Sequence, residues 1–169
     1  ANAWVAEEMV PAIELSVKQI NDQGGINGKE LKVIIEDAEG AAKASSAATK
    51  LIQENKVHAI YTITTPVVAV ASAIAEQEKK VLFAFTVVNT FAKKNTYVFS
   101  DLRDVASECA ELSKTALARG DTKLAFFGND ADFSVECYAS LQENFIPKGK
   151  IVVTETKNSN DPDAKTQLL

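Results

Sequence analysis

The sequence has little of what most catalytic and metal sites need, because it contains a single histidine and two cysteines among 169 residues. One histidine cannot build a histidine-rich metal cluster, and the two cysteines lie far apart and form no zinc pattern or CxxC pair. The glycine motifs GxGxxG, GxxxxGK[ST] and GxSxG are also missing. We therefore expect no cofactor, no metal site and no enzymatic activity.

Positive charge is also in deficit, with 18 Lys and Arg residues against 23 Asp and Glu residues. The resulting net charge of -5 argues against nucleic acid and against anionic membrane surfaces as partners. There is no apolar run of about 18 residues that could form a transmembrane helix. The first residues, Ala-Asn-Ala-Trp, look like neither a natural start nor a signal peptide. We expect the mature part of a longer protein whose signal peptide has been removed.

The stretch HAIYTITTPVVAVASAIAE, residues 58–76, organises the chain. Residues 58–63 are apolar and β-branched or aromatic, which predicts a buried strand of a parallel sheet. Thr65 is then a good helix N-cap, and Pro66 fits the first helical position, where its missing N–H is harmless. A helix that begins at the carboxyl end of a strand presents free N–H groups to an anion.

The other segments before residue 100 alternate between helix and strand. Apolar residues at helical spacing predict a helix over residues 4–22, with Gly24 as its left-handed C-cap. Further patterns predict strands at residues 31–36 and 81–85, a helix at 41–53, a loop at 86–95 and an extended piece at 97–99. Near residues 100–104 a new set begins, with helical stripes around Cys109 and Cys137 and strands at 123–128 and 150–155. A turn at 158–163 then precedes a helix that begins near residue 165.

This alternation predicts an α/β fold with parallel, doubly wound sheets. The chain opens with a helix that lacks a preceding strand, and it closes inside a helix. We therefore expect both ends to be cut. A fragment without its first strand would leave sheet edges unpaired, so we also expect self-association.

The segments AIELSVKQINDQGGINGKELKVIIEDAEG at 12–40, NTYVF at 95–99 and LAFFGNDADFSVECYASLQENF at 124–145, with the stretch at 58–76, resemble a known family. They are similar to the branched-chain amino-acid (Leu/Ile/Val) type of periplasmic substrate-binding protein, the type I fold of ABC importers. The resemblance implies a two-lobed protein: residues 1–99 would be lobe one without its first strand, 100–104 the hinge, and 105–169 the truncated start of lobe two.

The resemblance also implies a site. In the family two loops of lobe one hold the ligand's carboxylate through hydroxyl and N–H groups, and the matching positions here are Thr64 and Thr65, then Thr86 and Val87. Trp4 would wall the pocket, and Phe133 would reach it from lobe two. Valine replaces a family threonine at Val87, so the pocket is less polar and suits an apolar or aromatic acid as well as an amino acid. The implied protein is periplasmic or extracellular, membrane-anchored and bacterial, and it serves an ABC-transporter permease.

Simpler interpretations stand beside these. Thr64 and Thr65 could serve only as helix caps, Phe133 could pack in the core, and Trp4 could be a core residue or a frayed end. Cys109 and Cys137 could be buried free thiols or a disulfide formed in an oxidising compartment. The same fold also serves as the ligand-sensing domain of receptors and regulators, and fold alone does not separate sensing from transport.

Overall fold

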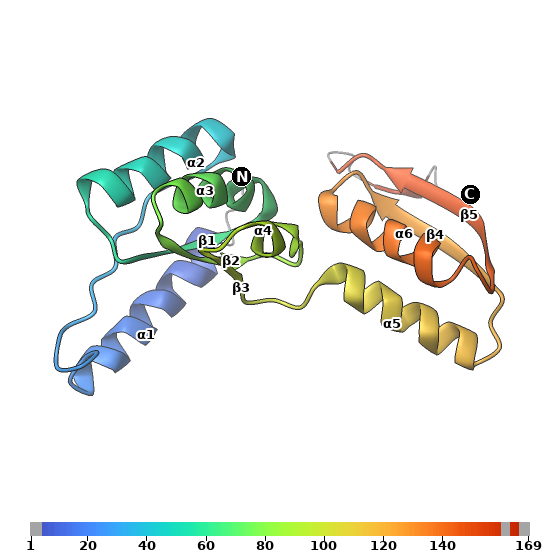
Figure 1. Ribbon diagram of the computed structural model, residues 1–169, viewed down its shortest axis with the longest axis horizontal. Helices are drawn as coiled ribbons and strands as arrows, with labels where there is room; N and C mark the ends of the chain where they lie inside the picture. The colour runs from blue at the N-terminus through green and yellow to red at the C-terminus, as the bar shows by residue number, and fades with distance from the viewer. Residues whose placement is uncertain (1–4, 160–162, 166–169) are drawn as a thin grey trace.

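The computed structural model of the chain describes residues 5–159 and 163–165. Its strands form two separate sheets, a three-stranded one and a two-stranded one. Figure 1 shows the two sheets side by side with their own helices, joined by an extended segment after β3. All strand pairs are parallel, which confirms the predicted fold class.

The first sheet has the order β1-β2-β3, with β1 at Ala59–Ile63, β2 at Val81–Phe85 and β3 at Val98–Ser100. The predicted positions of these strands are confirmed. Helix α2 (Gly40–Thr49) continues as the π-helical turn η2 (Lys50–Glu54), and α3 (Thr65–Gln77) connects β1 to β2. Buried alanines on α2 and α3 let these two helices approach each other closely, and α3 packs on all three strands of the sheet. The core between them is centred on Val68 and Leu82, which are fully buried.

The opposite face of this sheet carries an exposed aromatic row. Tyr61, Phe83 and Phe99 are directly aligned across β1, β2 and β3, and they remain 43%, 44% and 49% exposed. Their neighbours along each strand point to the other face, into the core, as the two-residue period of a strand requires. We call Tyr61, Phe83 and Phe99 the aromatic row.

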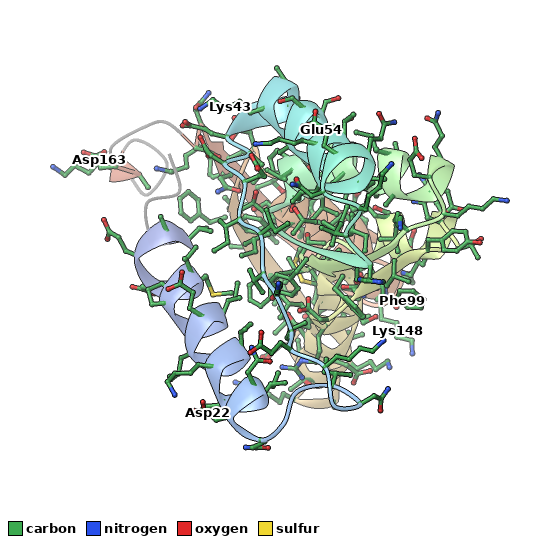
Figure 2. All side chains as sticks on the ribbon, turned by 90° about the vertical axis from the view of Figure 1, so that its left-hand side faces the viewer. Asp22, Lys43, Glu54, Phe99, Lys148 and Asp163 are labelled. Carbon is green, nitrogen blue, oxygen red and sulfur yellow. A yellow bond between two sulfur atoms is a disulfide. The ribbon has the colours of Figure 1, made fainter. Side chains whose placement is uncertain are left out.

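The first helix consists of the π-helical turn η1 (Val5–Met9) and α1 (Val10–Asp22), and no described residue in it is buried. Gly24 has a φ of +97°, so the predicted left-handed helix end is confirmed. Asp22, at the end of α1, lies far from Lys43 on α2 (Figure 2). The helix therefore stands apart from the layer that α2 and α3 form on the first sheet.

The predicted strand at residues 31–36 is wrong as a sheet element, since this segment joins no sheet in the described part of the chain. A strand is defined by its hydrogen-bonded neighbour, and none of the described strands pairs with this segment. Asn21 holds its first residue, because the Asn21 side chain accepts the N–H of Leu31 at 2.8 Å and donates to its carbonyl at 2.9 Å. The segment's apolar side chains, Val33, Ile34 and Ile35, are exposed.

The second sheet pairs β4 (Lys123–Asn129) with β5 (Lys150–Lys157), and α5 (Val105–Ala118) packs beside α6 (Asp132–Asn144). The predicted helices and strands of this part are confirmed. A disulfide joins Cys109 on α5 to Cys137 on α6, with a Cα–Cα distance of 5.4 Å. Of the two alternatives for these cysteines, the structure therefore has the disulfide and not free thiols.

Two smaller differences from the sequence-based expectation remain. The segment expected to be a loop, residues 86–95, contains a short helix, α4 (Thr90–Lys94). The helix expected from residue 165 falls almost entirely outside the described residues.

Candidate functional site

The two threonine-containing loops lie at one edge of the first sheet. Strands β1 and β2 end together, with Ile63 paired to Phe85, so the residues that follow them emerge side by side. The N–H of Thr64 donates to the carbonyl of Phe85 at 3.4 Å and links the two loops. The structure thus brings Thr64 and Thr65 next to Thr86 and Val87, at the carboxyl end of the strands.

The start of α3 differs from the predicted cap. Thr64, not Thr65, is the N-cap residue, and it has no side-chain capping hydrogen bond. Thr64 has a φ of 72°, which is unusual for a β-branched residue. Thr65 is the first residue of the helix, and Pro66 follows it within the first turn. The prediction of Thr65 as a cap is therefore wrong, and its hydroxyl has another partner.

That partner is the hydroxyl of Thr86, whose Oγ1 lies 3.0 Å from Oγ1 of Thr65. Thr86 is only 4% exposed, whereas Thr65 is half-buried. Oγ1 of Thr86 also accepts the backbone N–H of Val88 at 3.2 Å, and the Thr86 carbonyl accepts the hydroxyl of Ser100 at 3.1 Å. The two loops are therefore connected by side-chain as well as backbone hydrogen bonds.

The same edge of the sheet is tied to the segment that leads to the second sheet. The carbonyl of Val87 accepts the N–H of Val105, the first residue of α5, at 2.9 Å. Tyr61 interacts with Asp101 in this segment. Burial, then the charge of Asp101 and a hydrogen bond to it, raise the pKa of Tyr61 to about 12, so its phenol stays protonated at neutral pH.

The two aromatic residues expected at the site have different outcomes. Phe133 is the second residue of α6 and is 45% exposed, so it is not part of the buried core formed by the second sheet and its helices. The interpretation of Phe133 as a packing residue is therefore not supported. Trp4 lies outside the described residues.

Sequence reasoning missed a charged cluster beside these loops. Nζ of Lys93 on α4 lies 3.0 Å from Oδ2 of Asp104, the residue before α5. Burial, and then the nearby Asp104, raise the pKa of Glu136 on α6, while Lys93 and a hydrogen bond from Thr90 lower it. No spacing or motif in the sequence marks these residues, because they come from three separate elements.

The surface of the described residues is hollowed in several places, and two open depressions lie beside α4 and α5. One, of about 420 Å³, is lined by residues of α4 and β3, among them Asn89, Lys93 and Phe99, and the side-chain oxygen of Asn89 is buried there without a hydrogen-bond partner. The other, of about 680 Å³, lies at the carboxyl end of α5 beside Lys114 and Lys148, away from the threonine loops. Neither depression includes the four loop residues.

Among residues 5–159 and 163–165, no group of three or more His, Cys, Asp or Glu side chains is arranged to hold a metal ion. Within the same described ranges, no helix has both the length and the apolar character that a membrane span requires.

A sequence model of the family described as "Periplasmic binding protein" matches residues 1–169. No curated protein matches the chain. Among solved structures, the branched-chain amino acid transporter substrate binding protein LivJ from Streptococcus pneumoniae, in complex with isoleucine, is 26% identical. It superposes with a TM-score of 0.78 over 92% of this chain and 45% of its own.

Two further solved structures share the fold. A solute binding protein of an ABC transporter from Rhodopseudomonas palustris BisB5, in complex with 3,4-dihydroxybenzoic acid, is 24% identical, with a TM-score of 0.83 over 98% of this chain and 46% of its own. A solute binding protein from R. palustris, in complex with benzoate, is 20% identical, with a TM-score of 0.76 over 94% of this chain and 46% of its own. The chain spans about half the length of the solved structures that it matches.

Proposed function

Because the chain belongs to the periplasmic binding protein family, we propose that it is part of an extracytoplasmic solute-binding protein for an ABC importer. The protein captures a small ligand with a carboxylate and releases it unchanged. One observation carries this proposal: the Thr64-Thr65 and Thr86-Val87 loops converge at the carboxyl end of two parallel strands, where α3 begins. Binding proteins of this family are not enzymes, and we extend that property to this chain.

The carboxylate binds to donors that these loops supply. The first turn of α3 has backbone N–H groups without intrahelical partners, and the positive end of the helix dipole favours an anion there. The half-buried hydroxyl of Thr65 lies in the same turn. A carboxylate at this edge thus receives charge-assisted hydrogen bonds from backbone and side chain together.

The two sheets correspond to two lobes that close on the ligand. Residues 1–99 form lobe one, 100–104 the hinge, and 105–169 the start of lobe two. Trp4 from lobe one and Phe133 from lobe two flank the apolar part of the ligand. The exposure of Phe133 supports this role, since a residue that contacts ligand must be accessible before binding.

The ligand is an amino acid or an apolar or aromatic acid. Val87 provides an apolar side chain where a hydroxyl would favour a polar ligand, and Trp4 and Phe133 add aromatic surface. Isoleucine in the Streptococcus pneumoniae protein and benzoate in the Rhodopseudomonas palustris protein represent the two ligand classes to test first. The ligand-loaded protein delivers its ligand to a membrane permease, and the protein itself is anchored at the membrane surface.

Calorimetric titration of the complete protein with L-isoleucine, L-leucine, benzoate and 3,4-dihydroxybenzoate tests the proposal. Thr65→Ala should lose roughly 1.5–3 kcal/mol of binding free energy, or about tenfold to over a hundredfold in affinity, because one charge-assisted hydrogen bond disappears. His58→Ala is the matched control, since His58 lies just before β1 at the opposite end of the strand and should leave affinity unchanged. Unchanged affinity in Thr65→Ala would refute the assignment of the site. Chemical conversion of any of the four ligands by the protein would contradict a role in binding alone.

A further inference from the structure

The hydroxyl of Thr86 is enclosed in the protein and has defined neighbours. It is 3.0 Å from the hydroxyl of Thr65, and it accepts the N–H of Val88 at 3.2 Å. With an exposure of 4%, Thr86 is buried, while Thr65 is half-buried at the start of α3. The two hydroxyls therefore form a short chain that runs from the interior to the edge where the ligand would bind.

The direction of this chain follows from hydrogen-bond satisfaction. A hydroxyl has one hydrogen to donate and two lone pairs to accept with. If Thr65 donated to Thr86, the Thr86 oxygen would accept twice and its own hydrogen would be left in the interior without an acceptor. A buried unsatisfied donor is unfavourable, whereas a half-exposed one can reach water or a ligand. Thr86 therefore donates to Thr65, and the hydrogen of Thr65 is left free at the edge of the sheet.

We propose that Thr86 is a positioning residue, which fixes the Thr65 hydroxyl as a donor toward the ligand's carboxylate through the chain Val88 N–H, Thr86 hydroxyl, Thr65 hydroxyl. This inference rests on the proposed function, and it gives Thr86 an indirect role where direct ligand contact was expected. A hydroxyl that already accepts one hydrogen bond donates more strongly, because neighbouring hydrogen bonds polarise one another. The chain thus pre-orients a donor for an anionic group before the ligand arrives.

A double-mutant cycle on the complete protein tests the proposal, with affinities measured for L-isoleucine, L-leucine, benzoate and 3,4-dihydroxybenzoate. Thr86→Val keeps the side-chain shape and removes the hydroxyl, and it should weaken binding by about three- to tenfold through loss of one oriented hydrogen bond. Thr86→Ser should restore affinity to within about twofold, because it keeps the donor. In a Thr65→Val background, Thr86→Val should change affinity by less than about twofold, since the residue it orients is gone.

The outcomes separate the two proposals. If none of the probes binds the wild-type protein, or Thr65→Val leaves affinity unchanged, the proposed function and this inference both fail. If Thr65→Val weakens binding but Thr86→Val does not, the inference alone fails. Equal losses from Thr86→Val in both backgrounds indicate a merely structural role and also overturn it. Thr86→Ala replaces Thr86→Val in the cycle if the valine variant does not melt cooperatively.

Discussion

The ammonium of Lys93 lies 3.0 Å from the carboxylate of Asp104, and this ion pair links α4 to the residue that precedes α5. The same Oδ2 of Asp104 accepts the hydroxyl of Ser107 at 3.2 Å. Glu136 of α6 lies close enough to Lys93 and Asp104 to interact electrostatically with both. Charged groups from both sheets' helices therefore meet where the chain crosses from one sheet to the other.

The pKa of Glu136 leads to a pH-dependent prediction. Burial and Asp104 raise this pKa, with a smaller contribution from Asp132, while Lys93 and Thr90 oppose the rise. A carboxyl whose folded pKa is raised contributes stability that is present below its unfolded pKa and lost as the pH rises through its folded pKa. Glu136→Gln should therefore gain stability relative to wild type as the pH rises above about 4, the ordinary pKa of a glutamate in an unfolded chain.

Urea unfolding at several values of pH measures this difference. The wild type and the glutamine variant should have similar unfolding free energies in acid, and the variant should be the more stable at neutral pH. Glu143→Gln is the control, because Glu143 is exposed on the same helix and should show no such trend. A difference for Glu136→Gln that is independent of pH would contradict the assignment.

The Cys109–Cys137 disulfide should stabilise the part of the chain that contains the second sheet, because it cross-links α5 and α6. Replacing both cysteines by serine should lower the free energy of unfolding by about 2–5 kcal/mol, as for other native disulfides. The melting temperature with and without a reductant measures the effect. The reductant should lower the wild-type value and leave the double-serine variant unchanged. A reduced wild type, verified by peptide mapping, that melts at its original temperature would refute this expectation.

Gly25 should tolerate alanine less well than Gly24, although both have positive φ values. A Cβ at Gly25 would overlap the backbone carbonyl of Lys29, whereas a Cβ at Gly24 would meet open space. Gly24→Ala should lower the free energy of unfolding by about 1–2 kcal/mol because of left-handed backbone strain. Gly25→Ala should lower it clearly more, because the overlap with Lys29 is added to that strain. Chemical unfolding of the two variants compares them directly, and equal losses would show that the turn relaxes around the added methyl group.

The isolated 169-residue chain should self-associate, since the aromatic row of Tyr61, Phe83 and Phe99 is exposed on one face of the first sheet. Sedimentation velocity at increasing concentration should show oligomers, and Phe83→Ser should weaken their formation. Val135→Ser on α6 is a matched control, because Val135 is an exposed apolar residue outside the row. A monomer that melts cooperatively at all concentrations would contradict this prediction.

If Trp4 contacts the ligand as proposed, Trp4→Ala in the complete protein should weaken binding of large ligands more than of small ones, because an aromatic side chain contributes by apolar contact area. Calorimetric titration with benzoate and L-alanine compares the two cases. An equal loss for both ligands would assign Trp4 a structural role.

Much of the fold could be predicted from residue patterns. The short apolar runs that form β1 and β2 are buried on one face of the sheet. Turn residues bound each run in the sequence, and this made the strands recognisable. Residues 31–36 also contain an apolar run, at 33–35, but they join no described sheet, because pairing depends on a neighbouring strand and not on the segment itself. The local residue pattern predicts that a segment tends to be extended. Whether it joins a sheet depends on the rest of the fold, which must supply a neighbouring strand.

The candidate site was partly predictable for the same reason. Parallel strands end at one edge, so the convergence of the loops after β1 and β2 follows from topology. The bond between Thr65 and Thr86 was not predictable, because helix capping and a cross-loop hydrogen bond compete for the same hydroxyl. The disulfide and the Lys93–Asp104 pair also depend on how separate helices pack.

The backbone of Thr64 has a consequence for laboratory evolution. A threonine held at a φ of 72° carries strain of order 1–3 kcal/mol, which glycine would not have. A library selected only for heat resistance should therefore accumulate Thr64→Gly early. Parallel selection for binding of the proposed carboxylate ligand should keep threonine if its side chain contacts that ligand. The residue kept at position 64 under the two selections would then separate what Thr64 contributes to folding from what it contributes to the proposed binding.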